Sequence, residues 1–111
     1  MIGNTKDKLL PGTLEMLVLK ALCHGPMHGY GIAKRIKQLS YDALTVEEGS
    51  LYPALFRLRR AGYVKAQWAL SENNQSARYY ALTAAGRKQL ERETQVWERL
   101  ASGVMRVLES V

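Results

Sequence analysis

The sequence has little that is typical of an exported, membrane-spanning or disulfide-linked protein. Its 111 residues include one cysteine, so no disulfide can form within the chain. No apolar run approaches the ~18 residues of a membrane span, and the first residues, MIGNTKDK, lack the apolar segment of a secretion signal. We therefore expect a cytoplasmic protein in which Cys23 is a buried structural thiol.

Residue patterns that carry catalysis are equally scarce. We find no Gly-rich phosphate loop, no paired carboxylates and no nucleophile spaced to meet a base. Cys23, His24 and His28 could offer three metal ligands, but zinc sites usually add a second spaced pair. We expect no enzymatic activity, no metal and no cofactor, and we interpret the two histidines as turn or cap residues.

The charge is strongly positive and unevenly distributed. The chain has 16 Lys and Arg against 10 Asp and Glu, a net charge of +6 and a pI near 9.7. Residues 1–83 contain 11 of these basic residues against 6 acidic ones. A basic excess favours acidic partners, although charge alone is weak support for nucleic-acid binding.

The spacing of apolar residues predicts a mainly α protein with a small β-hairpin. Steps of three and four predict helices over residues 12–24, 29–39 and 50–61. Ser50 would cap the third helix, and Gly62 would adopt the left-handed conformation after its end. A period of two predicts strands within 63–70 and 77–83, joined by a polar tip, SENNQS. In the first strand Val64, Ala66, Trp68 and Leu70 alternate with Tyr63, Lys65 and Gln67.

After Thr83 a helical period returns and continues to about residue 109. Three short helices, a hairpin and a closing helix are the element order of a winged helix-turn-helix, in which the helix before the hairpin enters the DNA major groove. We expect a flexible N-terminus over 1–8, a winged-helix DNA-binding domain over 9–83 and a C-terminal dimerisation helix over 84–111.

The predicted helix over residues 50–61 has arginines on the side opposite its leucines. Such arginines usually form a solvated helix face. Two rings, Tyr52 and Phe56, beside three arginines favour DNA contact instead, with arginines on phosphates or guanines and rings near thymine methyls. The polar hairpin tip could be an ordinary loop or a sugar-phosphate contact. The candidate DNA-binding residues are Tyr30, Lys34, Ser50, Tyr52, Pro53, Phe56, Arg57, Arg59, Arg60, Asn73, Asn74, Gln75 and Arg78. The alternative is a protein-interaction module without sequence-specific DNA binding.

The last helix carries a narrow apolar seam that favours a partner helix. Because a helix of ~27 residues extends ~40 Å, a small domain cannot cover it, and we expect a homodimer. The candidate interface residues are Leu90, Trp97, Leu100, Val104 and Leu108. Trp97 could simply pack in this interface, or paired tryptophans could line a cleft for a flat hydrophobic or aromatic effector.

The sequence resembles the PadR family of bacterial transcriptional regulators, in particular its short branch with a single C-terminal helix. The matching stretches are LLPGTLEMLVLKAL, GPMHGYGIAKRI, EEGSLYPALFRL, SENNQSARYYALTAAGRKQL and WERL. The resemblance implies a homodimeric repressor that binds a palindromic operator, with Ser50 to Pro53 on the recognition helix and Ser71 to Arg78 in the wing. Family members often respond to small aromatic or hydrophobic molecules near the dimer interface.

One position departs from this resemblance. Where the family commonly has an acidic residue after the RL of the recognition helix, this sequence has Arg59, giving RLRR. The extra cation would change either the set of DNA contacts or the sequence preference.

Overall fold

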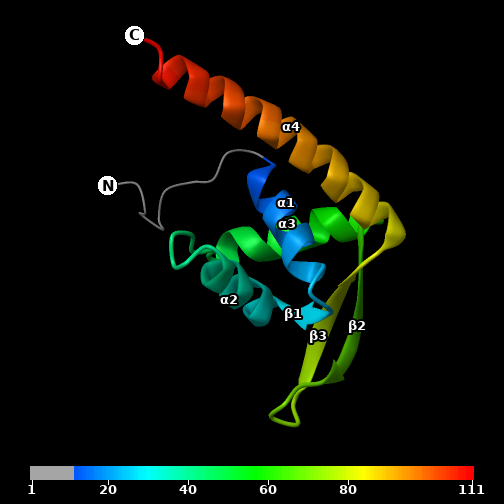
Figure 1. The fold of residues 1–111 in the computed structure, drawn as a ribbon. Coiled ribbons are helices and arrows are strands. Elements are labelled where there is room, and N and C mark those ends of the chain that lie inside the picture. Colours follow the sequence, from blue (N-terminus) through cyan, green and yellow to red (C-terminus); the bar gives the residue numbers. More distant parts are fainter. Residues whose placement is uncertain (1–11) are drawn as a thin grey trace.

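A computed structural model describes residues 12–111, and Figure 1 shows how the elements are arranged. The expected flexible segment 1–8 lies outside the described residues. The elements are α1 (Thr13–Leu22), β1 (Met27–His28), α2 (Gly29–Leu39), α3 (Glu48–Arg60), β2 (Val64–Leu70), β3 (Ser76–Leu82) and α4 (Ala84–Leu108). This order of helices and strands confirms the predicted fold, a mainly helical winged helix-turn-helix. In the described part, no helix is long and apolar enough to cross a membrane.

The core lies where α1, α2 and α3 meet one face of the hairpin. Its largest fully buried side chains are Val18, Leu19, Ile32, Leu51, Leu55 and Val64. The buried residues of each helix lie three or four positions apart, so one stripe is buried: Val18, Ala21 and Leu22 in α1, Ile32 and Ile36 in α2, and Leu51, Leu55 and Leu58 in α3. Cys23 is only partly buried at the edge of this core, which corrects the expectation of a fully buried thiol.

The predicted start of the third helix was wrong by two residues. α3 begins at Glu48 after an extended Glu47, whose side chain makes no capping hydrogen bond, and Ser50 lies inside the first turn. Ser50 therefore does not cap the helix. Gly62 has φ of 83°, the left-handed conformation expected after the helix end.

The sheet has three strands in the order β1-β3-β2, one more than predicted. The short β1 pairs antiparallel with Tyr79 and Tyr80 of β3. β2 and β3 pair along their whole length, with Ala66 opposite Tyr80 and Trp68 opposite Arg78. Tyr80 is buried, but Trp68 is 66% exposed, although the register places both on the same face of the hairpin. The hairpin extends past the core as a wing (Figure 1).

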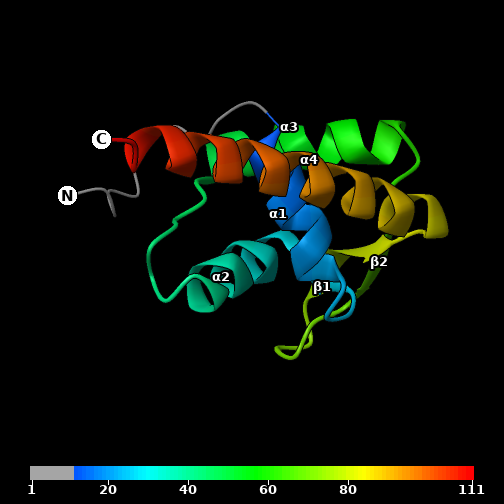
Figure 2. The ribbon, with the colours of Figure 1, turned by 45° about the horizontal axis from the view of Figure 1, so that its top comes forward.

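α4 begins where the wing returns to the core. The Thr83 hydroxyl accepts a hydrogen bond from the Gly86 amide at 3.0 Å and so caps the helix. A Cβ at Gly86 would collide with the Tyr63 carbonyl oxygen, so only glycine permits this close approach. Figures 1 and 2 show α4 crossing over α1 and continuing beyond the domain to the C-terminus.

Candidate nucleic-acid interface

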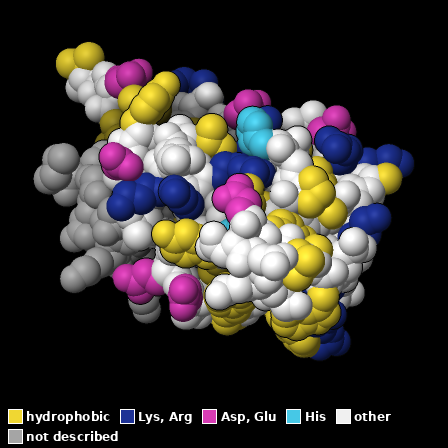
Figure 3. Space-filling model, turned by 90° about the horizontal axis from the view of Figure 1, so that it is seen from below, with side chains coloured by type: hydrophobic (Ala, Val, Ile, Leu, Met, Phe, Trp, Pro, Cys, Tyr) yellow, Lys and Arg dark blue, Asp and Glu magenta, His cyan; other side chains and the backbone are white. Residues whose placement is uncertain are grey.

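A hollow of about 870 Å³ lies between the start of α2, the side of α3 and the wing. Six of the thirteen candidate DNA-binding residues line it: Tyr30, Lys34, Tyr52, Asn73, Gln75 and Arg78. Figure 3, seen from the side on which the wing projects, shows basic side chains spread among polar, apolar and some acidic ones rather than in one continuous patch. We call this hollow and its rim the wing-side surface.

Tyr52 joins α3 to α2 rather than projecting freely. A Cβ on Gly29 would lie 2.6 Å from the Tyr52 hydroxyl, so the ring occupies the space that the glycine leaves. The ring is still 44% exposed. Partial burial, followed by the neighbouring Glu48 carboxylate, raises the pKa of the Tyr52 phenol above its ordinary value. The phenol therefore remains a hydrogen-bond donor at neutral pH.

His28 caps α2, as the sequence predicted. Its Nδ1 accepts a hydrogen bond from the Gly31 amide at 3.0 Å. The ring stacks with Tyr30 at 6.5 Å and meets Tyr79 edge to face at 5.4 Å. A Cβ at Gly31 would meet the Met27 sulfur, so the two glycines around Tyr30 allow this packing. Tyr30 itself stays exposed at the rim of the hollow.

Arg35 has a structural role that the sequence did not reveal. Its guanidinium donates to the Ala21 carbonyl at 2.8 Å and to the Gly25 carbonyl at 3.1 Å. These oxygens belong to the end of α1 and the turn after it, where carbonyls lack helical partners. Arg35 thus fixes α2 against α1, and Lys34 is the neighbouring cation left exposed.

The arginines of α3 divide between its two flanks. Arg57 pairs with Glu15 of α1, with Nε 2.7 Å from Oε2. The guanidinium carbons of Arg59 and Arg60 both lie 5.9 Å from the centre of the exposed Phe56 ring, within range of a cation–π contact. Ser50 and Pro53 are exposed on the same helix but, like these three arginines and Phe56, they do not line the hollow.

The tip of the wing is a tight polar turn. The Ser71 amide donates to the Gln75 carbonyl at 2.7 Å, and Asn74 has φ of 63°, a conformation that asparagine tolerates. Asn73 and Gln75 line the hollow, whereas Asn74 is exposed away from it. Within residues 12–111 the Arg78 Nε is buried without a hydrogen-bond partner, and Arg78 is also one of the residues that line the hollow.

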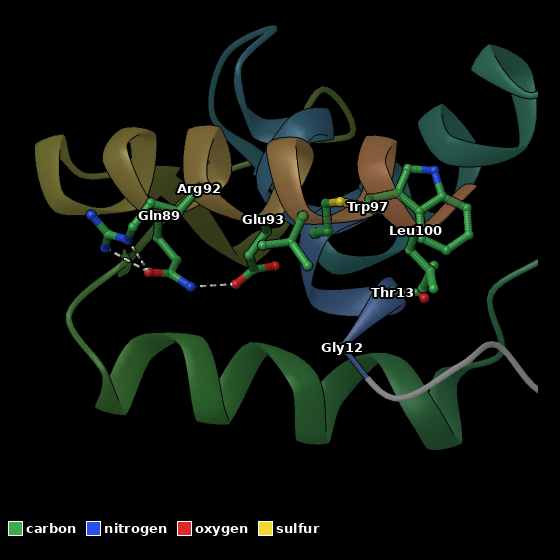
Figure 4. Close-up of a pocket in the computed structure, with 9 residues that line it drawn as sticks. Gly12, Thr13, Gln89, Arg92, Glu93, Trp97 and Leu100 are labelled. Atoms are coloured by element: carbon green, nitrogen blue, oxygen red, sulfur yellow. Dashed lines mark hydrogen bonds between the residues drawn. The ribbon is translucent and has the colours of Figure 1, made fainter. Parts of the chain in front are cut away.

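A second, smaller hollow of about 350 Å³ lies between the start of α1 and the middle of α4 (Figure 4). Trp97, Val96, Leu100 and Met16 give it an apolar lining. At its other end the Gln89 amide donates to Glu93 at 2.6 Å and accepts from Arg92 at 2.6 Å. Trp97 remains 38% exposed.

Comparison with known proteins agrees with this arrangement. Residues 18–92, which include the start of α2, all of α3 and the wing, match the model of the Transcriptional regulator PadR-like family. The chain belongs to the PadR-like family. Its members are transcriptional regulators and not enzymes, which confirms the expectation from the sequence.

Solved PadR structures share the fold over most of the chain. A PadR family regulator from Eggerthella lenta is 32% identical, with a TM-score of 0.74 over 90% of this chain and 85% of that one. A PadR-like regulator from Bacillus cereus is 26% identical, with a TM-score of 0.79 over 95% of this chain and 100% of that one. The identification as a PadR-like regulator therefore extends to α4.

A curated relative has a different length. An uncharacterized 37.1 kDa protein in a transposon of Streptomyces fradiae is 45% identical over 81% of this chain. This PadR-like chain spans only 24% of that protein, about a quarter of its length.

Among residues 12–111 no three His, Cys, Asp or Glu side chains are grouped to hold a metal ion.

Proposed function

We propose that this PadR-like chain is a cytoplasmic homodimeric repressor that binds a palindromic operator in double-stranded DNA. The observation that carries the proposal is the wing-side surface, where α2, α3 and the wing all present donor side chains around one hollow. Phenol, ammonium, guanidinium and amide groups all donate to phosphate oxygens. A merely solvated helix face would not require three elements to converge in this way.

Apart from Arg57, which pairs with Glu15, the candidate residues would divide into two groups. Tyr30, Lys34 and Arg78, with Asn73, Asn74 and Gln75 at the tip, would hold the sugar-phosphate backbone and set the register on the duplex. Ser50, Pro53, Phe56, Arg59 and Arg60 are exposed on α3 and would face the major groove, where arginine reads guanine and rings contact thymine methyls. Tyr52 would donate a hydrogen bond where the two groups meet.

Dimerisation through α4 is the second part of the proposal. Trp97, Leu100, Val104 and Leu108 are exposed along the helix, which supports a contact with a second copy. Leu90 is only 8% exposed in the protomer's own core, so it offers little surface to a partner. A two-fold axis through α4 would set the two recognition helices about one turn of DNA, ~34 Å, apart.

Release by a small hydrophobic or aromatic effector is the third part. The hollow beside Trp97 has a volume within the ~300–1,000 Å³ range of small-molecule sites. It lies between α4, which would form the dimer, and α1, which carries the Glu15 partner of Arg57. A bound ring could therefore act on both the interface and the recognition helix.

A gel shift with the promoter of the chain's own gene tests the DNA-binding proposal. The chain should retard the promoter fragment at lower concentration than a scrambled duplex, and Lys34→Ala should weaken both complexes by a similar factor. If no duplex is retarded, the protein-interaction alternative takes its place. For the effector, aromatic compounds should quench the emission of Trp97 in a Trp68→Phe chain and release DNA over the same concentration range.

A further inference from the structure

The wing exposes two large apolar side chains that neither the core nor the hollow uses. Trp68 and Leu70 are each 66% exposed, although both are on β2. The register pairs Trp68 with Arg78 and Leu70 with Ser76, on the same face of the hairpin as the buried Tyr80. The helices cover this face only as far as Ala66 and Tyr80, so its outer part, which we call the wing patch, is bare.

Large apolar side chains exposed at the edge of a sheet increase the risk of aggregation. β2 is an edge strand, because the strand order is β1-β3-β2. Apolar side chains on an exposed edge strand favour unwanted pairing with other chains. A single exposed apolar residue needs no explanation, but a tryptophan and a leucine on one face of a projecting hairpin indicate a contact surface.

The surroundings of the wing patch indicate what covers it. Arg78, the direct cross-strand neighbour of Trp68, lines the wing-side surface. Lys34 lies on the same hollow, and Asn73 and Gln75 extend it to the tip. Glu72 is the one acidic side chain between residues 64 and 82. A polyanion that also has apolar surface fits this combination better than an acidic or purely apolar protein.

The outer part of the wing projects far enough from the core to reach a groove of a duplex. Four residues of β2 lie beyond Ala66, and at about 3.3 Å per residue they project the patch by roughly 13 Å. The minor groove is ~7.5 Å deep. Proteins that bind in the minor groove commonly combine apolar side chains with arginine, lysine, asparagine or glutamine contacts.

We infer that the wing patch, Trp68 and Leu70, contacts the deoxyribose and base edges of duplex DNA beside the recognition helix, with Arg78 on the adjoining phosphate. This inference rests on the proposed function and deepens it. It assigns to the wing an apolar contribution to DNA affinity in addition to its phosphate contacts. Because Trp68 has no charge, its contribution is independent of salt.

Two binding measurements on the full chain test the inference, with labelled promoter duplex as the probe. Trp68→Ala should lower the affinity about ten-fold, within the range of losses measured when a stacked aromatic side chain is removed. The slope of log affinity against log salt should not change. Arg78→Ala should also lower the affinity, but it should make the slope shallower by about one. Tyr41→Ala removes another exposed ring, far from the wing in sequence, and should leave the affinity unchanged.

Fluorescence gives an independent readout that does not depend on the alanine variant folding. Addition of duplex to the unaltered chain should quench tryptophan emission and protect it from acrylamide, and Trp68→Phe should remove that component. Unchanged Trp68 emission in the bound state, or full affinity in Trp68→Ala, would overturn the inference while leaving the DNA-binding function standing. A Trp68→Ala chain that binds DNA normally but self-associates less would assign the patch to a second copy instead. If the unaltered chain binds no duplex, the proposed function itself fails.

Discussion

The Nε atom of Arg57 on α3 lies 2.7 Å from Oε2 of Glu15 on α1. The two residues are 42 positions apart, so only the folded chain brings them together. The pair neutralises one arginine of α3 and directs it toward α1. Arg57 is therefore the candidate DNA-binding residue whose surroundings least favour a direct contact with DNA.

Glu15→Gln should release Arg57 as a free cation. We expect the affinity for nonspecific duplex to rise a few-fold and the salt dependence to steepen by about one, because one more cation can displace a counterion. The loss of folding stability should be at most about 1 kcal/mol, since the pair is partly exposed. Binding isotherms at several salt concentrations measure the first effect and thermal unfolding the second.

Glu91→Gln is the matched control for this prediction. Glu91 is exposed on α4 and makes no ion pair among the described residues, so the substitution changes the net charge equally without releasing a partner. An equal rise in affinity in both variants would mean that net charge, rather than the release of Arg57, explains the effect.

Arg60→Ala should weaken operator binding more than Arg57→Ala. Arg60 is exposed beside Phe56, and loss of a base-reading arginine costs about 1–3 kcal/mol and relaxes the preference at one base pair. Arg57 is already paired, so its removal should cost less than about 1 kcal/mol. Competition with single-base operator variants measures the affinity loss and the base preference of each variant. A larger affinity loss in Arg57→Ala than in Arg60→Ala would contradict this prediction.

Gly29→Ala should destabilise the fold and displace Tyr52. The added methyl would lie 2.6 Å from the phenol oxygen, and such overpacking typically costs about 1–3 kcal/mol. Gly49→Ala is the control, because a Cβ at this position in α3 meets nothing within 4 Å. Alanine there should stabilise the helix by up to about 1 kcal/mol. Thermal unfolding of the Gly29→Ala and Gly49→Ala variants measures both effects. Equal unfolding temperatures would refute the close contact between Gly29 and Tyr52.

Trp97→Asp should dissociate the dimer and abolish operator binding together, because each half-site alone binds weakly. A carboxylate buried against an apolar partner helix is strongly unfavourable. Ser102→Asp introduces the same group at another exposed position of α4, off the seam, and should leave the dimer intact. Sedimentation velocity at micromolar concentration gives the masses. A Trp97→Asp chain that stays dimeric would place the interface elsewhere.

The fold was largely predictable from local patterns. The bounds of α2 were predicted without error and those of α4 to within one residue, because apolar periodicity and the Thr83 cap are signals within each segment. The two-residue β1 could not be predicted, since it has no period of its own and exists only because Tyr79 and Tyr80 pair with it. The start of α3 was missed because Glu47, the residue before the helix, makes no capping hydrogen bond with its side chain.

The candidate site was predictable in composition but not in arrangement. The sequence placed Tyr52 and the arginines on one outward face. In the structure, Tyr52 packs against Gly29 of α2, and Arg57 forms an ion pair with Glu15 of α1. Both contacts depend on how helices cross, which a single helix's periodicity does not specify. The bare position of Trp68 was missed for a related reason, because strand alternation identifies a face but not where the covering helices end.

The effect of salt on the affinity for a labelled operator duplex tests the central claim most directly. If each half of a dimer binds ~3 to 4 phosphates through the wing-side surface, log affinity should fall linearly with log salt, with a slope of about −5 to −7. An affinity for operator that does not change with salt, or that equals the affinity for a scrambled duplex, would contradict the claim that this surface binds operator DNA.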